Sequence, residues 1–140
     1  MRMVPVAAAL LLAACQPGRG SPDASPTESF SGIADDEVIF LTGTEPFWGG
    51  EIKGDTALYT TPENQDGARF EVERFAGNNG LGFNGALDGK PFDLTVTPGE
   101  CSDGMSDRTY PHTVTLLIGE EQRQGCAWTD AQPFSGPENP

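Results

Sequence analysis

Three cysteines carry the most specific chemistry in this sequence, and the first of them, Cys15, ends a short apolar run. Leu12, Ala13 and Ala14 directly precede it, and small residues of this kind let a peptidase bring extended backbone close to its active site. The thiol is then the nucleophile that accepts a diacylglycerol group. The pattern therefore predicts lipidation of Cys15 at the N-terminus of the mature chain.

The apolar run itself predicts a cleaved leader. It spans residues 4–14, contains Pro5 and is shorter than the ~20 apolar residues that a membrane-spanning helix needs. Residues 1–14 are therefore expected to be a bacterial lipoprotein signal peptide, the alternative being that Cys15 is an ordinary cysteine after a secretory peptide. Palmitate-type chains would then hold the protein on a membrane. Because Gln16 rather than an aspartate follows the cysteine, we expect the outer membrane of the bacterial cell envelope, facing the periplasm.

The two remaining cysteines predict a disulfide bond. With Cys15 used for lipid, only Cys101 and Cys126 are left, and the envelope outside the inner membrane is oxidising. Closing a loop of about 26 residues is expected to stabilise the fold by roughly 3 to 4 kcal/mol. The alternative is a metal site, but these thiolates and a single histidine, His112, do not supply the four ligands of structural zinc.

Residues 98–111 form the longest expected connection and carry most of the candidate binding residues. Asp103 and Asp107 are weak candidate ligands for calcium, which takes about six to eight oxygen atoms. We favour the alternative in which Asp103 and Ser106 hydrogen-bond the loop's own amides while Arg108 pairs with a nearby carboxylate. The candidate binding loop comprises Glu100, Ser102, Asp103, Ser106, Asp107, Arg108 and Tyr110.

Two adjacent aromatic residues, Phe47 and Trp48, follow a tight connection and are the candidate rim aromatics. Neighbours on a strand face opposite sides, so one of them should lie in the core and the other outside or at the rim of the fold. An exposed Trp48 would offer a platform for a ligand. A core or rim role is favoured over that function.

Catalysis finds little support in the sequence. A hydrolytic triad would need His112 near Ser102 or Ser106 and an acid, and all of these lie close together in the chain. Closeness in sequence is not geometry, however, and a nucleophile elbow, a metal-ligand pair and a phosphate-binding glycine loop are all missing. We therefore expect a protein that is not an enzyme and has no cofactor, with a hydrolase as the remote alternative.

The acidic balance limits the partners. The formal net charge is −13, which makes nucleic acid and anionic lipid surfaces poor partners. It permits a cationic protein, divalent cations or, as the simplest interpretation, no more than solubility.

Short apolar or alternating segments separated by glycine-bearing turns run from Val38 to Trp128, with no sustained helical periodicity. About eight short strands at regular spacing predict a small antiparallel up-and-down barrel or a strongly curled sheet, with a two-sheet β-sandwich as the alternative. The aromatic residues expected to supply most of the core are Phe47, Trp48, Phe70, Phe75, Phe83, Phe92 and Trp128.

The two flanks have a different composition. Residues 15–36 are rich in Pro, Gly, Ser, Asp and Ala, with Phe30 and Ile33 as the only large apolar residues, and predict a lipidated disordered tether. Residues 129–140 contain three prolines and predict a disordered tail. One β-barrel domain over residues 37–128, expected to be a monomer, remains.

Several segments resemble a group of uncharacterised bacterial envelope lipoproteins with a Cys-Ser-Asp-Gly-Met-Ser-Asp-Arg-x-Tyr-Pro motif. The likeness covers nearly the whole domain, implies an envelope location and supports the pairing of the two later cysteines, but it carries no established activity. The segments concerned are residues 43–48, 59–64, 101–111 and 125–127.

A looser, architectural similarity links the plan of lipidated tether, small barrel and one disulfide to membrane-bound inhibitors of c-type lysozyme. The Ser-Gly-x-x-Tyr segment that those inhibitors insert into lysozyme is absent. The acidic domain and its tether predict a lipid-anchored, non-enzymatic protein-binding or envelope-maintenance module, and inhibition of a cationic hydrolase such as lysozyme is one version of that role. A periplasmic module for a small ligand or calcium is the alternative.

Overall fold

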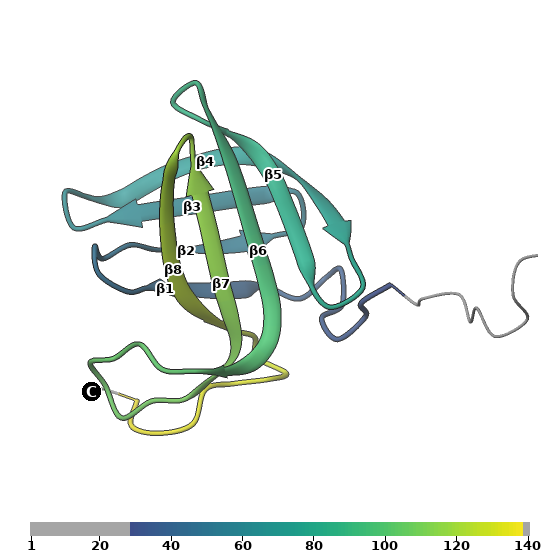
Figure 1. The fold of residues 1–140 in the computed structure, drawn as a ribbon, viewed down its shortest axis with the longest axis vertical. Helices are drawn as coiled ribbons and strands as arrows, with labels where there is room; N and C mark the ends of the chain where they lie inside the picture. Colours follow the sequence, from purple (N-terminus) through teal and green to yellow (C-terminus); the bar gives the residue numbers. More distant parts are fainter. Residues whose placement is uncertain (1–28, 139–140) are drawn as a thin grey trace, which may run out of the picture.

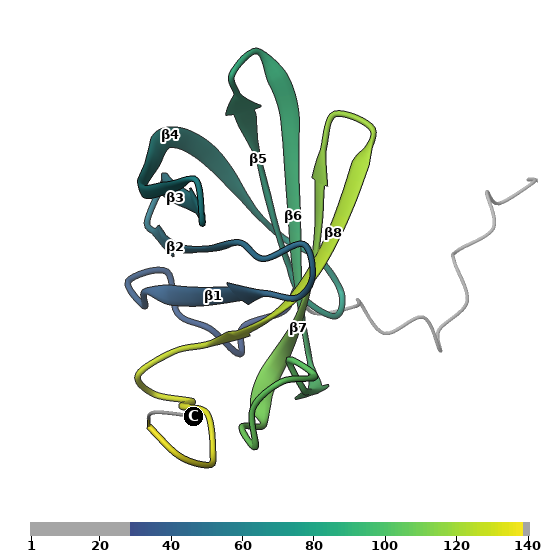
Figure 2. The ribbon, with the colours of Figure 1, turned by 90° about the vertical axis from the view of Figure 1, so that its left-hand side faces the viewer.

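The structure is a computed structural model that describes residues 29–138. The predicted signal peptide, Cys15 and most of the predicted tether lie outside this part of the chain. Eight antiparallel strands, paired in chain order, close into a barrel in which the first strand pairs with the last (Figures 1 and 2). This confirms the up-and-down barrel rather than the β-sandwich. The strands are β1 (Ile39–Gly43), β2 (Gly49–Lys53), β3 (Thr56–Thr61), β4 (Asn64–Ala76), β5 (Leu81–Leu87), β6 (Lys90–Cys101), β7 (Tyr110–Ile118) and β8 (Glu121–Trp128).

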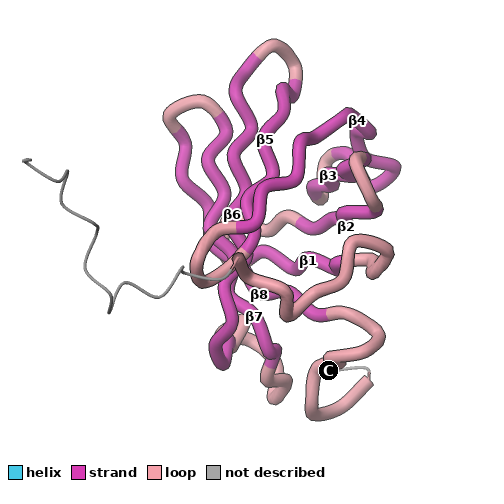
Figure 3. Tube along the Cα trace, turned by 90° about the vertical axis from the view of Figure 1, so that its right-hand side faces the viewer, coloured by secondary structure: helices cyan, strands magenta, loops and turns pink. Residues whose placement is uncertain are grey.

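The up-and-down topology sorts the loops onto two ends of the barrel. The β1–β2, β3–β4, β5–β6 and β7–β8 loops share one end, here called the Trp48 end. The other end, here called the disulfide end, carries the β2–β3, β4–β5 and β6–β7 loops and both ends of the described chain (Figure 3). Within residues 29–138, no helix has the length and the apolar character that crossing a membrane requires.

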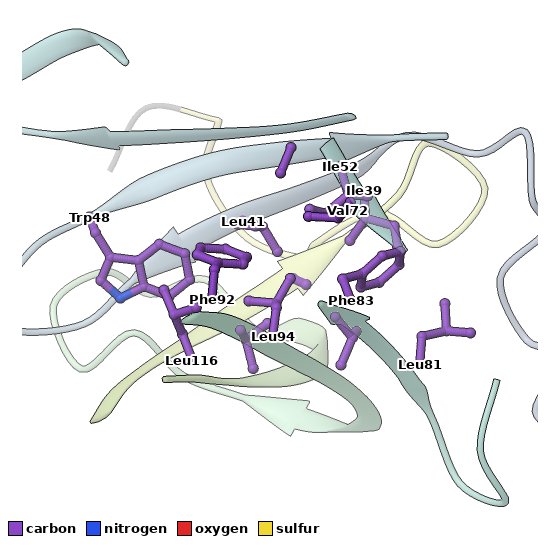
Figure 4. Packing of buried hydrophobic residues seen from close by; sticks show 14 of the residues in the cluster. Ile39, Leu41, Trp48, Ile52, Val72, Leu81, Phe83, Phe92, Leu94 and Leu116 are labelled. Carbon is purple, nitrogen blue, oxygen red and sulfur yellow. The ribbon is translucent and has the colours of Figure 1, made fainter. Parts of the chain in front are cut away.

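Side chains from all eight strands fill the barrel. Alternation along β6 turns Phe92, Leu94 and Val96 inward, and each of them is almost completely buried. Phe83 on β5 and Leu116 on β7 pack beside them (Figure 4). The interior is therefore a packed core, as expected of a barrel of this strand number.

The aromatic core is smaller than expected. Trp48, Phe83 and Phe92 are buried and Phe70 packs against the core at its margin, but Phe75 is 65% exposed. The reason is the period of two along β4: Val72 points inward, and Phe75 lies an odd number of residues further on. The prediction that Phe75 belongs to the core was wrong.

Trp128 was also expected in the core, and it lies on the outer surface instead. Its neighbour Ala127 is completely buried, so Trp128 points outward, where it stacks on Phe40 at 5.4 Å between ring centroids. Tyr110 and Phe134 complete an outer aromatic cluster at 5.2 and 5.6 Å from Trp128. This cluster is a second, smaller site of apolar burial outside the barrel.

The C-terminal segment covers this cluster, so the predicted disordered tail was wrong for residues 129–138. Phe134 packs edge-on against Trp128, and Thr109 and Ser135 exchange backbone hydrogen bonds of 2.9 Å. Thr129 is completely buried. An outward-facing Trp128 needs an apolar cover, and the segment that follows it in the chain supplies one.

The N-terminal flank also belongs to the folded domain. Ile33 is only 1% exposed in the core cluster, and Phe30 packs against the same cluster. Arg74 donates to the carbonyl of Ile33 at 2.6 Å and pairs with Asp35 at 3.1 Å. The boundary predicted between residues 36 and 37 was therefore too late, because the two large apolar residues of the flank help to close the disulfide end.

His112 makes stability depend on pH. Its side chain is buried inside the barrel, and burial lowers its pKa below 6.5, although a hydrogen bond with the backbone of Ala127 and the charge of Glu37 oppose that shift. The unfolded chain then binds more protons than the native chain just below pH 6.5. We expect the melting temperature to fall as the pH falls through this range, and His112→Leu to flatten that dependence. Melting curves that keep their full pH dependence in the variant would contradict this origin.

Candidate functional site

Trp48 is a buried aromatic residue of the core at the Trp48 end of the barrel. It is 5% exposed, stacks on Tyr59 at 5.9 Å between ring centroids, and donates from Nε1 to the carbonyl of Gln124 at 3.1 Å. Gly43 lies directly beneath the indole, where a Cβ atom would overlap the ring. Glycine at the end of β1 is thus what allows the indole to lie across the barrel.

Phe47, the next residue, points the other way and is 44% exposed. This matches the expectation that strand alternation separates the two rim aromatics, whereas the prediction that Phe47 belongs to the core was wrong. Phe47 lines two surface clefts, of about 240 and 410 Å³. The larger is here called the Phe47 cleft, and its lining includes Glu45, Pro46, Phe47, Pro62, Glu63 and Arg123.

The Phe47 cleft carries an uneven distribution of charge. Arg123 donates from Nη2 to Glu121 at 3.0 Å, and its buried Nε has no hydrogen-bond partner. Glu45 and Glu63 form no ion pair within residues 29–138. Burial raises the pKa of Tyr59. The positive charge of Arg123 opposes this shift, and the negative charges of Glu121 and Glu63 add to it. Arg123 is therefore paired with Glu121, whereas Glu45 and Glu63 have no ion-pair partner among the described residues.

At the opposite end, the disulfide between Cys101 and Cys126 is formed, with 5.6 Å between the Cα atoms, as predicted. Cys101 is the last residue of β6 and pairs in register with Tyr110, the first residue of β7. The connection is therefore shorter than the predicted residues 98–111. Glu100, one of the candidate binding residues, is an exposed residue of β6.

Asp103 organises the β6–β7 loop from within. Its Oδ1 accepts from the amides of Met105 and Ser106 at 2.9 and 2.8 Å, and its Oδ2 accepts from the Ser106 hydroxyl at 2.7 Å. The Tyr110 hydroxyl lies 3.5 Å from the same oxygen, and Ser102 accepts from the amide of Gly104 at 3.2 Å. The side chains act as turn formers, as we favoured from the sequence.

The structure gives the calcium alternative no ligand set. Both oxygens of Asp103 face donors of its own loop, and Asp107 is exposed. In the described part of the chain, no three side chains of the His, Cys, Asp or Glu type gather to hold a metal ion. We therefore derive no metal chemistry for this loop.

Among the described residues, Arg108 does not pair with a carboxylate, contrary to expectation. Its Nε donates to the carbonyl of Pro137 at 2.6 Å, its Nη2 donates to the carbonyl of Glu138, and its guanidinium lies 4.0 Å from the ring centroid of Phe134. The planar guanidinium suits simultaneous hydrogen bonding and stacking. Arg108 thus fastens the C-terminal segment over the outer aromatic cluster.

Replacing Asp103 tests whether the loop is held by its own hydrogen bonds. The amide of Ser106 is the first cause that lowers the pKa of Asp103 below 3.8. The ionised carboxylate therefore stabilises the native state above pH 3.8, the ordinary pKa of the group. This stabilisation is lost as the pH falls below 3.8 and through the lower pKa of the native state. We expect Asp103→Ala to cost about 1 kcal/mol in urea unfolding at neutral pH. Asp107→Ala, the control, should change stability by less than about 0.5 kcal/mol. Equal costs would contradict the assignment.

The three residues of the hydrolytic alternative lie in different environments. His112 is buried inside the barrel, whereas Ser102 is exposed in the loop. The hydroxyls of Ser102 and Ser106 are engaged with groups of the loop itself. Among the described residues, His112 and these two serines therefore do not form the hydrogen-bonded base and nucleophile of a hydrolytic triad.

Sequence reasoning missed Glu45, Glu63 and Arg123, which line the same cleft as Phe47. They come from three regions of the chain: the β1–β2 loop, the β3–β4 loop and β8. The available signal is topological, because alternate loops of an up-and-down barrel share one end. That signal gives the end of the barrel on which residues meet, but not which side chains touch.

Comparison with protein-family models, with curated proteins and with solved structures finds no match for this chain.

Proposed function

We propose that this chain is a lipid-anchored, non-enzymatic binding module of the bacterial envelope, and that its partner is a cationic protein. The observation that carries the proposal is the Phe47 cleft, where an exposed aromatic ring lies beside two carboxylates that have no ion-pair partner among the described residues. Exposed aromatic residues are frequent anchors of protein interfaces. A formal net charge of −13 adds a long-range attraction for a positively charged partner.

The arrangement of the two ends supports this role. The described chain begins at the disulfide end, whereas the Phe47 cleft lies at the Trp48 end. With Cys15 as the anchor, the chain would enter the barrel from the membrane at the disulfide end, opposite the Phe47 cleft.

A cationic hydrolase such as c-type lysozyme is the first candidate partner, and the proposed effect is inhibition by covering its active site. The small-ligand alternative has less support, because core side chains from every strand occupy the barrel interior. A role in envelope maintenance would use the same Phe47 cleft to bind another cationic protein.

Titration of the full-length chain, purified from membranes in non-ionic detergent, against c-type lysozyme tests the binding role. We expect binding that is strong at low salt and weaker at physiological salt, because exposed charges contribute to the encounter. Lysozyme whose lysines have been succinylated is the control and should not bind. Absence of binding by native lysozyme at both salt concentrations would reject the inhibitor role.

The anchor has an independent test. Cells supplied with a clickable palmitate analogue should label the wild-type chain and retain it in the membrane fraction, whereas Cys15→Ser should abolish both. An unlabelled wild-type chain that accumulates in the cytosol would reject the proposed location.

A further inference from the structure

We propose that the Phe47 cleft is the binding site for a lysine or arginine side chain of the partner, held over the ring of Phe47 and between Glu45 and Glu63. This deepens the proposed function, on which it rests, by assigning the contact to particular residues. The partner segment therefore has a defined chemistry: an exposed basic side chain projecting from a cationic protein.

The ring of Phe47 is available for such a contact. It is 44% exposed and lines two surface clefts, so a side chain from outside can reach it. A cation within about 6 Å of a ring centroid is attracted by the aromatic face. Within residues 29–138 such contacts are made by Arg74 with Phe83 and by Arg108 with Phe134, so Phe47 is not covered by a cation of this part of the chain.

Charge complementarity selects a basic side chain over a neutral one. Glu45 belongs to the β1–β2 loop and Glu63 to the β3–β4 loop, so carboxylates from two loops line the same cleft. Neither has an ion-pair partner among the described residues, and the positive charge of Arg123 is balanced by Glu121 at 3.0 Å. A lysine or arginine would supply the missing counter-charge.

A second acidic surface on the barrel provides a matched control. A larger open groove of about 910 Å³ is lined by Asp55, Glu71 and Glu73, together with Arg74. It contains no aromatic residue. It should therefore share the general attraction for cations but lack the ring that fixes a basic side chain.

The experiment compares two double variants of the full-length chain that lose the same charge. With c-type lysozyme as the probe, Glu45→Gln/Glu63→Gln should weaken binding about tenfold, and Glu71→Gln/Glu73→Gln less than about threefold. Phe47→Leu should weaken binding by about two- to fivefold, and Phe47→Trp should retain it. An equal loss for both double variants, or no loss for the first, would overturn the site.

Pentalysine provides a second probe that does not depend on lysozyme. Added to isotope-labelled full-length chain in detergent micelles, it should shift the amide signals of Phe47, Glu45 and Glu63 more than those of Glu71 and Glu73. Such shifts without any lysozyme binding would support the cleft and reject lysozyme as the partner. Shifts spread evenly over both surfaces, or centred on Glu71 and Glu73, would overturn the cleft even if lysozyme binds.

Discussion

Replacing both Cys101 and Cys126 by alanine is expected to lower the free energy of unfolding by about 3 to 4 kcal/mol. The bond closes a segment with a sequence separation of 25 and joins β6 to β8 across the start of β7. Without it the unfolded chain gains conformational freedom that folding must remove. Urea unfolding followed by circular dichroism measures the difference.

Reduction supplies the control for this prediction. Dithiothreitol should shift the unfolding midpoint of the wild-type chain close to that of the double variant, and it should leave the double variant unchanged. A double variant that unfolds at the wild-type midpoint would show that the crosslink contributes little to stability.

Trp48→Ala should lower the free energy of unfolding by about 3 to 5 kcal/mol, because it removes a large buried ring and leaves a cavity at the Trp48 end. The substitution also removes the donor to Gln124 and the stacking partner of Tyr59. Thermal and urea unfolding measure the loss.

The adjacent Phe47 is the matched control. Phe47→Ala removes an exposed ring and should change stability by less than about 0.5 kcal/mol while weakening partner binding. The two variants thus separate the residue that holds the barrel end together from the residue proposed to make the contact. Equal losses of stability would contradict the opposite orientations of the two side chains.

The fold could be predicted from the sequence because its signals are local. Phe92, Leu94 and Val96 alternate with polar residues, and each is buried in the barrel. The Asp88-Gly89 pair marks a hairpin turn, and both residues have positive φ, 51° and 78°. Short-range patterns of this kind specify strands and tight turns. The number of strands then favours closure of the sheet into a barrel.

The predictions fail for residues whose apolar type and whose position in the chain indicate different locations. Phe75 has the wrong parity relative to Val72 for the core, so the alternation already placed it outside. The flanks are polar on average, so their composition does not indicate that individual apolar residues pack on the barrel. These residues are Phe30, Ile33 and Phe134. Which flank residue packs on the barrel depends on the surface that the barrel leaves uncovered, and this is a property of the tertiary structure.

The candidate site was predictable only in part. The separation of Phe47 from Trp48 follows from strand alternation, and the turn-forming role of Asp103 follows from its residue type. The approach of Glu63 and Arg123 to Phe47 does not follow, because it depends on barrel closure and on the register between strands that are distant in sequence.

Pairing of β1 with β8 completes a ring of hydrogen bonds through all eight strands. Within residues 29–138, every strand therefore has a paired neighbour on each side, and an extended segment of another molecule could add only to parts of strands, such as residues 64–71 of β4 on the side that faces β5. Anchoring to a membrane would raise the local concentration of the protein in two dimensions, a condition that promotes polymerisation of open sheets. Closure restricts such edge-to-edge contact to these parts of the strands.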